Sequence, residues 1–436
     1  MVDNIIEGMF LTNKPRLSIV HKIGTKLMDK YHFLAIECVK QNEIYVYEDG
    51  IYVEKGRAVI KRETEKMCGS FAGTNLVNEV IAKIERSKLI EREEMIKAPI
   101  EDVCINNGVL NLKTRVLTPH TPEKVFIRKL PVDYKIGAET STFIDFLNES
   151  LYEKDIKIMQ EWFGFCLWRK YHEKKALIMV GPRDTGKTVV LNTLENFLGT
   201  KNISTVDLHE MGGDKFAIER LYEKFANIND ELTSDDLNSV DKFKRATGNS
   251  LLTAEPKFKT AFRFHNFSKL TFATNKMPTL KGTMEDPESY YSRWIVLDFD
   301  NIIEEKDKNK SLVDEINTKT EMSGILNWAL DGLDRLMKNN GFSDDNNWEE
   351  VKHIMKTSGK SVFSFMANVV EKDREGFVDN GDLFNVYLQW CTLNSKEPEN
   401  KAIFGRKFNP DFGKRVTDGK RNGYAGIKLN KVLLKL

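Results

Sequence analysis

The chain has 436 residues, which predicts about three domains. Hydrophobic residues make up 41% of it and charged residues 30%, and the 66 basic against 65 acidic side chains leave a net charge of +1. This balance excludes a protein that binds nucleic acid through a uniformly basic surface, so any such surface must be local. No run of about 18 apolar residues occurs, which excludes a membrane-spanning helix.

The cysteines are scattered through the sequence, at Cys38, Cys68, Cys104, Cys166 and Cys391. Neither C-x-x-C nor H-x-x-x-H spacing is present, so the sequence does not favour a zinc site. The first ten residues include acidic side chains and no long apolar run, unlike a signal peptide. We therefore expect a soluble cytoplasmic protein that contacts no membrane.

Residues 1–140 predict a mixed α/β region. Glu43–Glu54 alternates apolar and polar residues on both sides of Asp49-Gly50, which indicates a β-hairpin. Ile105–Leu117 is a second candidate hairpin, with turns near Asn107-Gly108 and Lys113-Thr114. Between the two hairpins, Asn75–Arg92 carries apolar residues at helical spacing.

Residues 141–172 predict two helices, the first capped by Ser141. Phe143, Phe146, Leu147 and Leu151 form one apolar stripe, and a second stripe follows. The second stripe consists of Ile156, Met159, Trp162, Phe163 and Cys166. The pair is either a helical collar used for oligomerisation or a pair of ordinary core helices.

Strands and helices alternate over residues 173–337, the pattern of a mostly parallel sheet. The polar stretch Lys338–Glu350 opens a predicted linker, residues 338–364, and residues 365–436 form a small separate module. We therefore predict an α/β fold throughout.

A phosphate-binding loop follows the apolar run Ala176–Val180 and precedes a predicted helix, the context that such a loop requires. Its glycines turn backbone N–H groups toward a phosphate at the helix N-terminus. Lys187 would reach the β- and γ-phosphates of ATP, and the Thr188 hydroxyl would hold Mg²⁺. The alternative is a glycine-rich turn that binds no nucleotide. The residues of the loop are Gly181, Pro182, Arg183, Asp184, Thr185, Gly186, Lys187 and Thr188.

Two further strands end in side chains that complete such a site. After Lys224–Asn229, Asp230 would bind Mg²⁺ and Glu231 would polarise the attacking water. An alternating strand, Lys269–Thr274, ends at Asn275, whose amide could orient that water. The alternatives are a solvated acidic pair and a plain Asn-Lys-x-Pro turn.

Taken in order, GPRDTGKT, NINDE, LTFATNKMP and YYSRWIVLDF resemble the four motifs of superfamily 3 helicases. The resemblance extends to poxvirus D5-type and phage or plasmid primase–helicases. It covers Asn106–Thr114 and Pro131–Tyr134 on one side of the motifs, and Gly324–Gly332, Tyr387–Cys391 and Phe404–Lys407 on the other. The family resemblance thus runs from about residue 40 to the end.

This resemblance implies an AAA+-like P-loop ATPase core that assembles as a ring, usually a hexamer, and moves 3′ to 5′ on single-stranded DNA. It makes Arg293 an arginine finger supplied to a neighbouring subunit's ATP. A lone arginine is otherwise a surface residue or an ion-pair partner. The resemblance also places a DNA-gripping hairpin between the second and third motifs. Here that segment is Lys242–Lys259, and its Lys257, Phe258 and Lys259 would contact DNA, because an aromatic ring can stack on a base between two cations. The alternative is a solvated charged loop.

The last 36 residues are strongly basic, with ten lysines and arginines against two aspartates. The resemblance implies a C-terminal winged helix there, which would contact duplex or single-stranded DNA. The alternative is a solubilising tail. The candidate contacts are Arg406, Lys407, Lys414, Arg415, Lys420 and Arg421.

The sequence therefore predicts an ATP- and Mg²⁺-dependent DNA helicase in phage, plasmid or viral replication, with a primase or polymerase as a possible partner. About 40 residues precede the resemblance, too few for a fused primase domain, so we expect a separate primase or a helicase fragment. Two alternatives remain. One is an AAA+ ATPase that remodels DNA without unwinding, and the other is an origin-binding protein with nucleotide as a switch. The water-positioning residues Glu231 and Asn275 argue against the switch.

Overall fold

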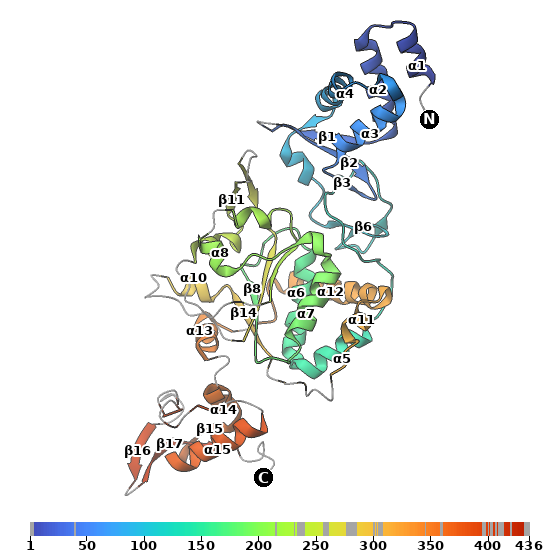
Figure 1. The fold of residues 1–436 in the computed structure, drawn as a ribbon. Coiled ribbons are helices and arrows are strands. Elements are labelled where there is room, and N and C mark those ends of the chain that lie inside the picture. The colour runs from blue at the N-terminus through green and yellow to red at the C-terminus, as the bar shows by residue number, and fades with distance from the viewer. Residues whose placement is uncertain are drawn as a thin grey trace.

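The computed structural model has a mixed α/β fold (Figure 1). Strands in the described part of the chain form five sheets of two to five strands. The described residues are 4–38, 41–213, 216–230, 232, 240–255, 261–275, 286–299, 301, 303, 308–344, 346–357, 361–394, 398–399, 401, 404–405, 408, 414–418 and 421–430.

The N-terminal unit is a four-stranded sheet, in the order β3-β2-β1-β4, packed against helices. The apolar side chains of α2, α3 and α4 and of the sheet form a core of their own. The strands are β1 (Phe33–Ile36), β2 (Glu43–Glu48), β3 (Ile51–Val53) and β4 (Leu89–Ile90). The helices are α1 (Asn4–Leu11), α2 (Arg16–Lys30), α3 (Gly56–Cys68), α4 (Thr74–Ser87) and the 3₁₀ turns η1 (Gly69–Phe71) and η2 (Arg92–Ile96).

Both predicted N-terminal hairpins are confirmed. In the first, Glu48 pairs with Ile51 around Asp49 and Gly50, whose positive φ angles of 50° and 89° suit a tight hairpin turn. The second is a small antiparallel sheet, in which Ile105 pairs with Gly108. It packs on the core of the following region rather than on the N-terminal core. Its strands are β5 (Asp102–Ile105), β6 (Gly108–Asn111) and β7 (Leu117–Thr118).

The central region is built on a five-stranded sheet, in which the paired strands are all parallel and the order is β14-β8-β13-β10-β9. This confirms the predicted parallel sheet. The strands are β8 (Ala176–Val180), β9 (Ile203–Ser204), β10 (Ala226–Asn229), β13 (Lys269–Thr274) and β14 (Trp294–Asp298).

Helices cover both faces of this sheet, so β8 is buried along its whole length. Leu177 and Met179 point into one core, and Ala176, Ile178 and Val180 point into the other. The predicted alternation in β13 is wrong for the same reason: all six of its residues are buried. Its Thr271 hydroxyl accepts a hydrogen bond from the Trp162 indole at 3.0 Å.

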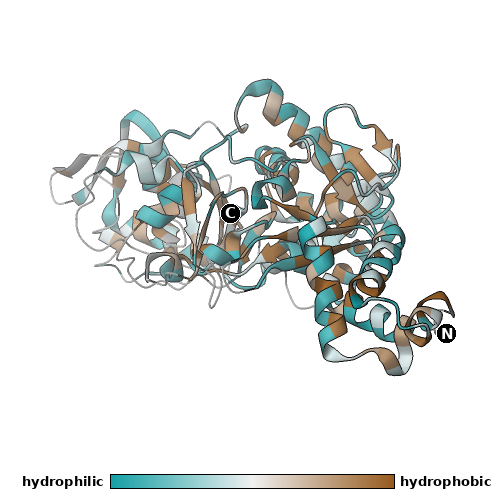
Figure 2. Cartoon of the chain, turned by 90° about the horizontal axis from the view of Figure 1, so that it is seen from above, coloured by the Kyte–Doolittle hydropathy of each residue, from teal (hydrophilic) through white to brown (hydrophobic). Residues whose placement is uncertain are grey.

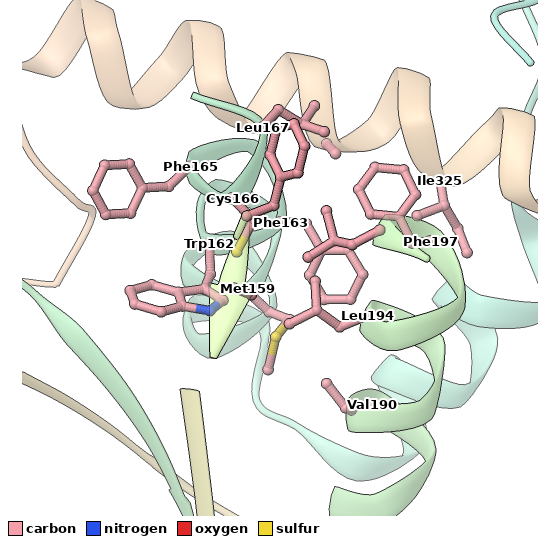
Figure 3. Packing of buried hydrophobic residues seen from close by; sticks show 14 of the residues in the cluster. Met159, Trp162, Phe163, Phe165, Cys166, Leu167, Val190, Leu194, Phe197 and Ile325 are labelled. Atoms are coloured by element: carbon pink, nitrogen blue, oxygen red, sulfur yellow. The ribbon is translucent and has the colours of Figure 1, made fainter. Parts of the chain in front are cut away.

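One core contains α5 (Ser141–Ser150), α6 (Glu153–Leu167), α7 (Lys187–Leu198) and α12 (Lys319–Asn339). Figure 3 shows Met159 and Phe163 of α6 facing Leu194 and Phe197 of α7, while Trp162 points to the other side of α6. The other core contains α8 (Leu208–Gly213), α9 (Asp241–Ala246) and α10 (Glu288–Tyr291). The remaining short elements are α11 (Leu312–Ile316), η3 (Thr200–Asn202) and η4 (Ile218–Leu221).

The two stripes predicted over residues 141–172 are buried or nearly so inside the first core. Their burial supports the core-helix alternative, because these faces are already covered by the chain's own side chains. Ser141 is the first residue of α5 rather than its cap. The capping position belongs to Thr140, whose hydroxyl bonds Glu321 of α12 at 2.5 Å.

The segment 338–364, predicted as a linker, contains the helix α13 (Trp348–Thr357). Its Val351 is 1% exposed and Met355 6%, and both join the second core of the sheet. The prediction failed because the polar run Lys338–Glu350 extends into the first turn of the helix, so the apolar stripe that follows was not recognised.

Within its described residues, the C-terminal unit has two helices and a three-stranded antiparallel sheet in the order β15-β17-β16 (Figure 1). It has its own core, which includes Phe365, Tyr387 and Trp390. Its elements are α14 (Ser361–Val369), β15 (Val370–Asp379), α15 (Asn380–Leu393), β16 (Lys414–Asp418) and β17 (Arg421–Leu429).

Helices of the chain are banded in hydropathy, with apolar and polar residues on different faces (Figure 2). This banding is what helices covered on one side require. Within the described residues, no helix combines the length and apolar character needed to cross a bilayer.

Candidate nucleotide site and nucleic-acid surfaces

The predicted phosphate loop connects β8 directly to α7, as its sequence pattern requires. Gly186 has a φ of +92° and Asp184 a φ of +62°, so the loop turns through left-handed conformations. A Cβ atom on Gly181 would lie 2.0 Å from the Phe299 carbonyl oxygen, at the end of β14. Only glycine fits at position 181, and the loop is held tightly against the sheet.

The Lys187 ammonium group is enclosed by its own loop. It donates to the carbonyl oxygens of Gly181 at 2.7 Å and Pro182 at 2.5 Å, and to the Thr185 hydroxyl at 3.2 Å. Burial lowers the pKa of Lys187 to about 8, against the opposing effect of the Asp184 carboxylate. The ammonium group is therefore still mostly charged at pH 7. It could donate to phosphate oxygens in place of the two neutral carbonyl oxygens.

The other loop side chains divide into buried and exposed groups. Thr185 is buried and its hydroxyl donates to the Pro182 carbonyl at 3.1 Å, which braces the turn. Arg183, Asp184 and Thr188 are exposed. Asp184 pairs with Lys308 at 3.1 Å, so its negative charge is partly neutralised beside the loop.

Asp230 and Asn275 lie at the same edge of the sheet as the phosphate loop. The carboxyl ends of parallel strands meet at one edge. Asp230 follows β10 and Asn275 follows β13, and both are exposed. The Gly181 N–H donates to the Thr274 carbonyl at 3.3 Å, which brings the residue before Asn275 against the start of the loop. Glu231 lies outside the described residues.

Two asparagines interrupt the apolar run of β10, and one of them has a clear structural role. Asn227 is fully buried, and its amide oxygen accepts from the Ser204 hydroxyl and the Val206 N–H while its amide nitrogen donates to the Val206 carbonyl. It therefore continues the pairing with the segment after β9. The side-chain oxygen of Asn229 is buried and has no hydrogen-bond partner among the described residues.

Sequence reasoning missed the contribution of α5 to the loop. A Cβ atom on Gly186 would lie 2.8 Å from the Phe146 ring and 3.0 Å from the Ser150 hydroxyl. The Ser150 oxygen is buried and has no partner within the described structure. The apolar stripe of α5 predicted that Phe146 is buried. The stripe does not indicate that the residue covering Phe146 is Gly186 of the phosphate loop.

Arg293 lies at the opposite edge of the sheet from Lys187. Its carbonyl accepts from the N–H of Ala176, the first residue of β8, at 2.6 Å. Its guanidinium group donates to the Thr247 hydroxyl at 3.1 Å and to the Ser289 carbonyl. Burial lowers the pKa of Arg293, and the charge of Asp286 opposes this shift.

The hairpin predicted between the second and third motifs has two described arms, β11 (Leu251–Ala254) and β12 (Phe262–His265), paired antiparallel. The predicted DNA contacts Lys257, Phe258 and Lys259 lie outside the described residues. Alternation puts Leu252 and Phe264 inward and leaves Arg263 exposed. Arg263 is a cation on the hairpin that sequence reasoning missed, although the period-two pattern FRFH could have indicated it.

Half of the candidate DNA contacts of the C-terminal unit lie outside the described part. Lys414 and Arg415 lie on β16 and Arg421 begins β17. The backbones of Asp418 and Arg421 are register partners across the hairpin. Arg406, Lys407 and Lys420 lie outside the described residues. The backbone therefore supports a basic hairpin here, without defining a contact between these cations and DNA.

Comparisons with known proteins give two family matches. Residues 18–179 match the family model described as "D5 N terminal like", and residues 179–293 match a "Family of unknown function (DUF5906)". The first match supports a D5-type family. No curated protein matches the chain.

The solved structures similar to this chain include "The apo structure of NrS-1 C terminal region (305-718)". It is 14% identical, with a TM-score of 0.47, and the match covers 93% of this chain and 98% of that one. The A form apo structure of the same region is 12% identical, with a TM-score of 0.47 and coverage of 93% and 99%. Similarity at this level carries no argument about fold or function.

Proposed function

We propose that this D5-type chain is an ATP-hydrolysing P-loop motor that works as a ring-shaped DNA helicase of superfamily 3. The observation that carries the proposal is the shared sheet edge of the phosphate loop, Asp230 and Asn275. A nucleotide-binding loop alone could serve a switch. A carboxylate and an amide at the ends of neighbouring strands are what hydrolysis needs in addition, because a metal ion and a water must both be positioned.

The oxygen donors at this edge fit Mg²⁺. The Thr188 hydroxyl and the Asp230 carboxylate are both exposed there, and Mg²⁺ takes one or two protein oxygens together with substrate phosphates. Bound Mg²⁺ would neutralise charge on the phosphate groups. Lys187 would bind the β- and γ-phosphates, Asn275 would orient the attacking water, and Glu231 would accept its proton.

The hairpin β11–β12 and the C-terminal unit are the proposed DNA-binding parts. The hairpin presents Arg263 on its exposed face and would carry Lys257, Phe258 and Lys259 at its tip. The two helices and antiparallel sheet of the C-terminal unit support the proposed winged helix. Its ten basic residues among the last 36 would supply phosphate contacts.

Nucleotide binding and hydrolysis can be separated by two variants. Lys187→Ala removes the cation on the phosphates, so fluorescent ATP analogues should no longer bind measurably. Lys174→Ala, an exposed lysine just before β8, makes the same change of charge and should bind normally. Glu231→Gln should bind ATP and hydrolyse it at least tenfold more slowly, since the general base is lost. Wild-type hydrolysis rates in both Lys187→Ala and Glu231→Gln would refute the motor.

Strand displacement on a 3′-tailed duplex then distinguishes a helicase from an ATPase that only remodels DNA. A helicase separates the strands in the presence of ATP and Mg²⁺, and the Glu231→Gln variant does not. DNA-stimulated hydrolysis without strand separation would favour the remodelling ATPase.

A further inference from the structure

A groove of about 1170 Å³ lies between the N-terminal unit and the central region. One wall comes from β2, β3 and residues 127–129, and the other from residues 201–224 and Phe262. The two units are joined beside it, where Arg128 donates to the Glu223 carbonyl at 2.9 Å and Asn202 to the Lys129 carbonyl at 2.7 Å. The groove is therefore a fixed feature of how the two units pack.

Cations from both walls line the groove: Arg128, Lys129, Lys201 and Lys224, together with Arg92 and Arg220. The Lys224 ammonium group donates to the Lys201 carbonyl at 2.6 Å, so the Lys224 side chain is held beside the Lys201 backbone. Burial, and then the positive charge of Arg128, lower the pKa of Lys224 to about 8. Arg128 also faces the Glu223 carboxyl group and Lys129 pairs with Asp49, so Lys201 and Lys224 are the cations that could bind an anion here.

The acidic residues of the groove lie mostly on the N-terminal wall and are largely engaged there. Asp49 pairs with Lys129 and Glu43 with Arg92, the latter at 3.2 Å. Glu48 pairs with Lys55 on its own hairpin. Within the described structure, neither Lys201 nor Lys224 is paired with a carboxylate. Glu54 on the N-terminal wall and Glu219 on the central wall complete the acidic lining, so the described basic side chains of the groove exceed the acidic ones by one.

The groove also has an aromatic lining, which includes Tyr222 and Phe262. The rings of Tyr222 and Phe262 meet edge to face at 4.7 Å, and the Arg92 guanidinium lies 4.6 Å from the Phe262 ring centre. Tyr45 adds a third ring to the lining. Phe262 is also the first residue of β12, the strand that leads back from the hairpin tip. Rings next to cations are the combination that binds single strands, because bases stack while phosphates are neutralised.

We infer that this groove binds a single strand of nucleic acid, with its phosphates against Lys201 and Lys224 and its bases toward Tyr222 and Phe262. The strand would enter from the β11–β12 hairpin and follow the junction of the two units. The inference rests on the proposed DNA-translocating function and adds to it a second binding surface, to which the N-terminal unit contributes.

The test measures the affinity of the full chain for a fluorescein-labelled oligo(dT). Fluorescence anisotropy reports the binding, and the titration is repeated from low to moderate salt. Lys201→Ala with Lys224→Ala should weaken binding roughly tenfold and reduce the slope of log K against log salt by about 1.4, the value for two lost single-strand phosphate contacts. Lys22→Ala with Lys338→Ala changes two exposed lysines outside the groove and should leave both quantities unchanged. Lys201→Glu changes one exposed side chain and should show the same trend if the double variant folds poorly.

Photo-cross-linking locates the strand independently. An oligonucleotide with 5-iododeoxyuridine should cross-link to Tyr222, Phe262 or Tyr45, mapped by mass spectrometry. Unchanged affinity and salt slope in the groove variants, or cross-links only elsewhere, would overturn the inference and leave a protein partner as the groove's occupant. Basal ATP hydrolysis, measured in parallel, reports on the proposed motor alone. If the wild type hydrolyses no ATP, the motor is refuted, and the oligonucleotide-binding result still decides the groove.

Discussion

Glu223 is a buried carboxyl group at the junction of the N-terminal unit and the central region. Its side chain is 7% exposed and lines a cavity of about 10 Å³ together with Arg128 and Arg169. Burial raises its pKa to about 7, and the two arginines only partly oppose this. The Arg169 Nε atom is buried and has no partner among the described residues. Ionised Glu223 is thus poorly compensated.

Glu223→Gln should therefore stabilise the protein at high pH. The folded state binds this proton more tightly than the unfolded state, so the free energy of unfolding falls as pH rises from about 4.5 to 7. With a shift of this size the loss is roughly 3 kcal/mol above pH 7. The thermal midpoint of the variant should exceed that of the wild type at pH 8 and nearly equal it at pH 5.

The control for this effect is Glu65→Gln, an exposed glutamate on α3. It should leave the difference in thermal midpoint close to zero at both pH values. A Glu223→Gln protein less stable than the wild type at pH 8 would mean that the carboxylate forms a favourable ion pair with Arg169.

At the scale of elements, the crossing of α6 and α12 depends on glycine. A Cβ atom on Gly164 would lie 2.3 Å from the Ala329 carbonyl oxygen, and one on Gly332 would lie 2.2 Å from the Gln160 carbonyl oxygen. The crossing is also fixed by Glu161, which is fully buried and accepts from Arg335 at 2.6 Å. The two helices therefore approach until their backbones touch.

Gly164→Ala should destabilise the chain although alanine favours helix. The propensity gain is about 1 kcal/mol, whereas forcing backbone atoms apart in a packed core typically costs about 1–3 kcal/mol or more. Gly8→Ala in α1 is the matched control, because a Cβ atom on Gly8 would have no heavy atom within 4 Å. We expect a lower thermal midpoint for Gly164→Ala and an equal or higher one for Gly8→Ala. Equal shifts in both variants would contradict the close crossing.

At the scale of the whole molecule, Arg293 and Lys187 are separated by the length of the sheet. β14 begins one residue after Arg293, and it runs beside all five residues of β8 before the phosphate loop begins. At about 3.3 Å per residue this is roughly 16 Å. Arg293 therefore does not reach the phosphate loop of its own chain, and the proposed role as a finger requires a neighbour in a ring.

Mixing two inactive variants tests that role. Arg293→Ala should bind ATP but hydrolyse it about 10³–10⁵-fold more slowly, the range known for arginine fingers. Lys187→Ala subunits keep their arginine, so adding them in excess should restore part of the ATPase activity in mixed rings. Arg86→Ala, an exposed arginine in α4, should be fully active alone. Co-assembled mixtures with no more activity than the separate variants would leave Arg293 as a structural residue held by Thr247 and Ser289.

Features that depend on neighbouring residues could be predicted without the structure. The Asp49-Gly50 turn, the strand–loop–helix order around Lys187 and the apolar stripes of α5 and α6 all follow from local dihedral preferences and side-chain periodicity. The position of Asp230 at a strand end also followed, because a phosphate loop in a parallel sheet requires such a partner.

Which distant segments meet became visible only in the folded chain. The sequence did not indicate that Val351 completes a core beneath a supposed linker, that Lys269 and Thr271 are buried in β13, or that Lys224 and Arg128 share a groove. Burial is set by the segments that pack on a residue from elsewhere in the chain, and these contacts leave no period or motif in the local sequence. For the same reason the sequence predicted a functional role for Arg293, while only the strand order of the sheet showed that Arg293 lies at the edge opposite Lys187.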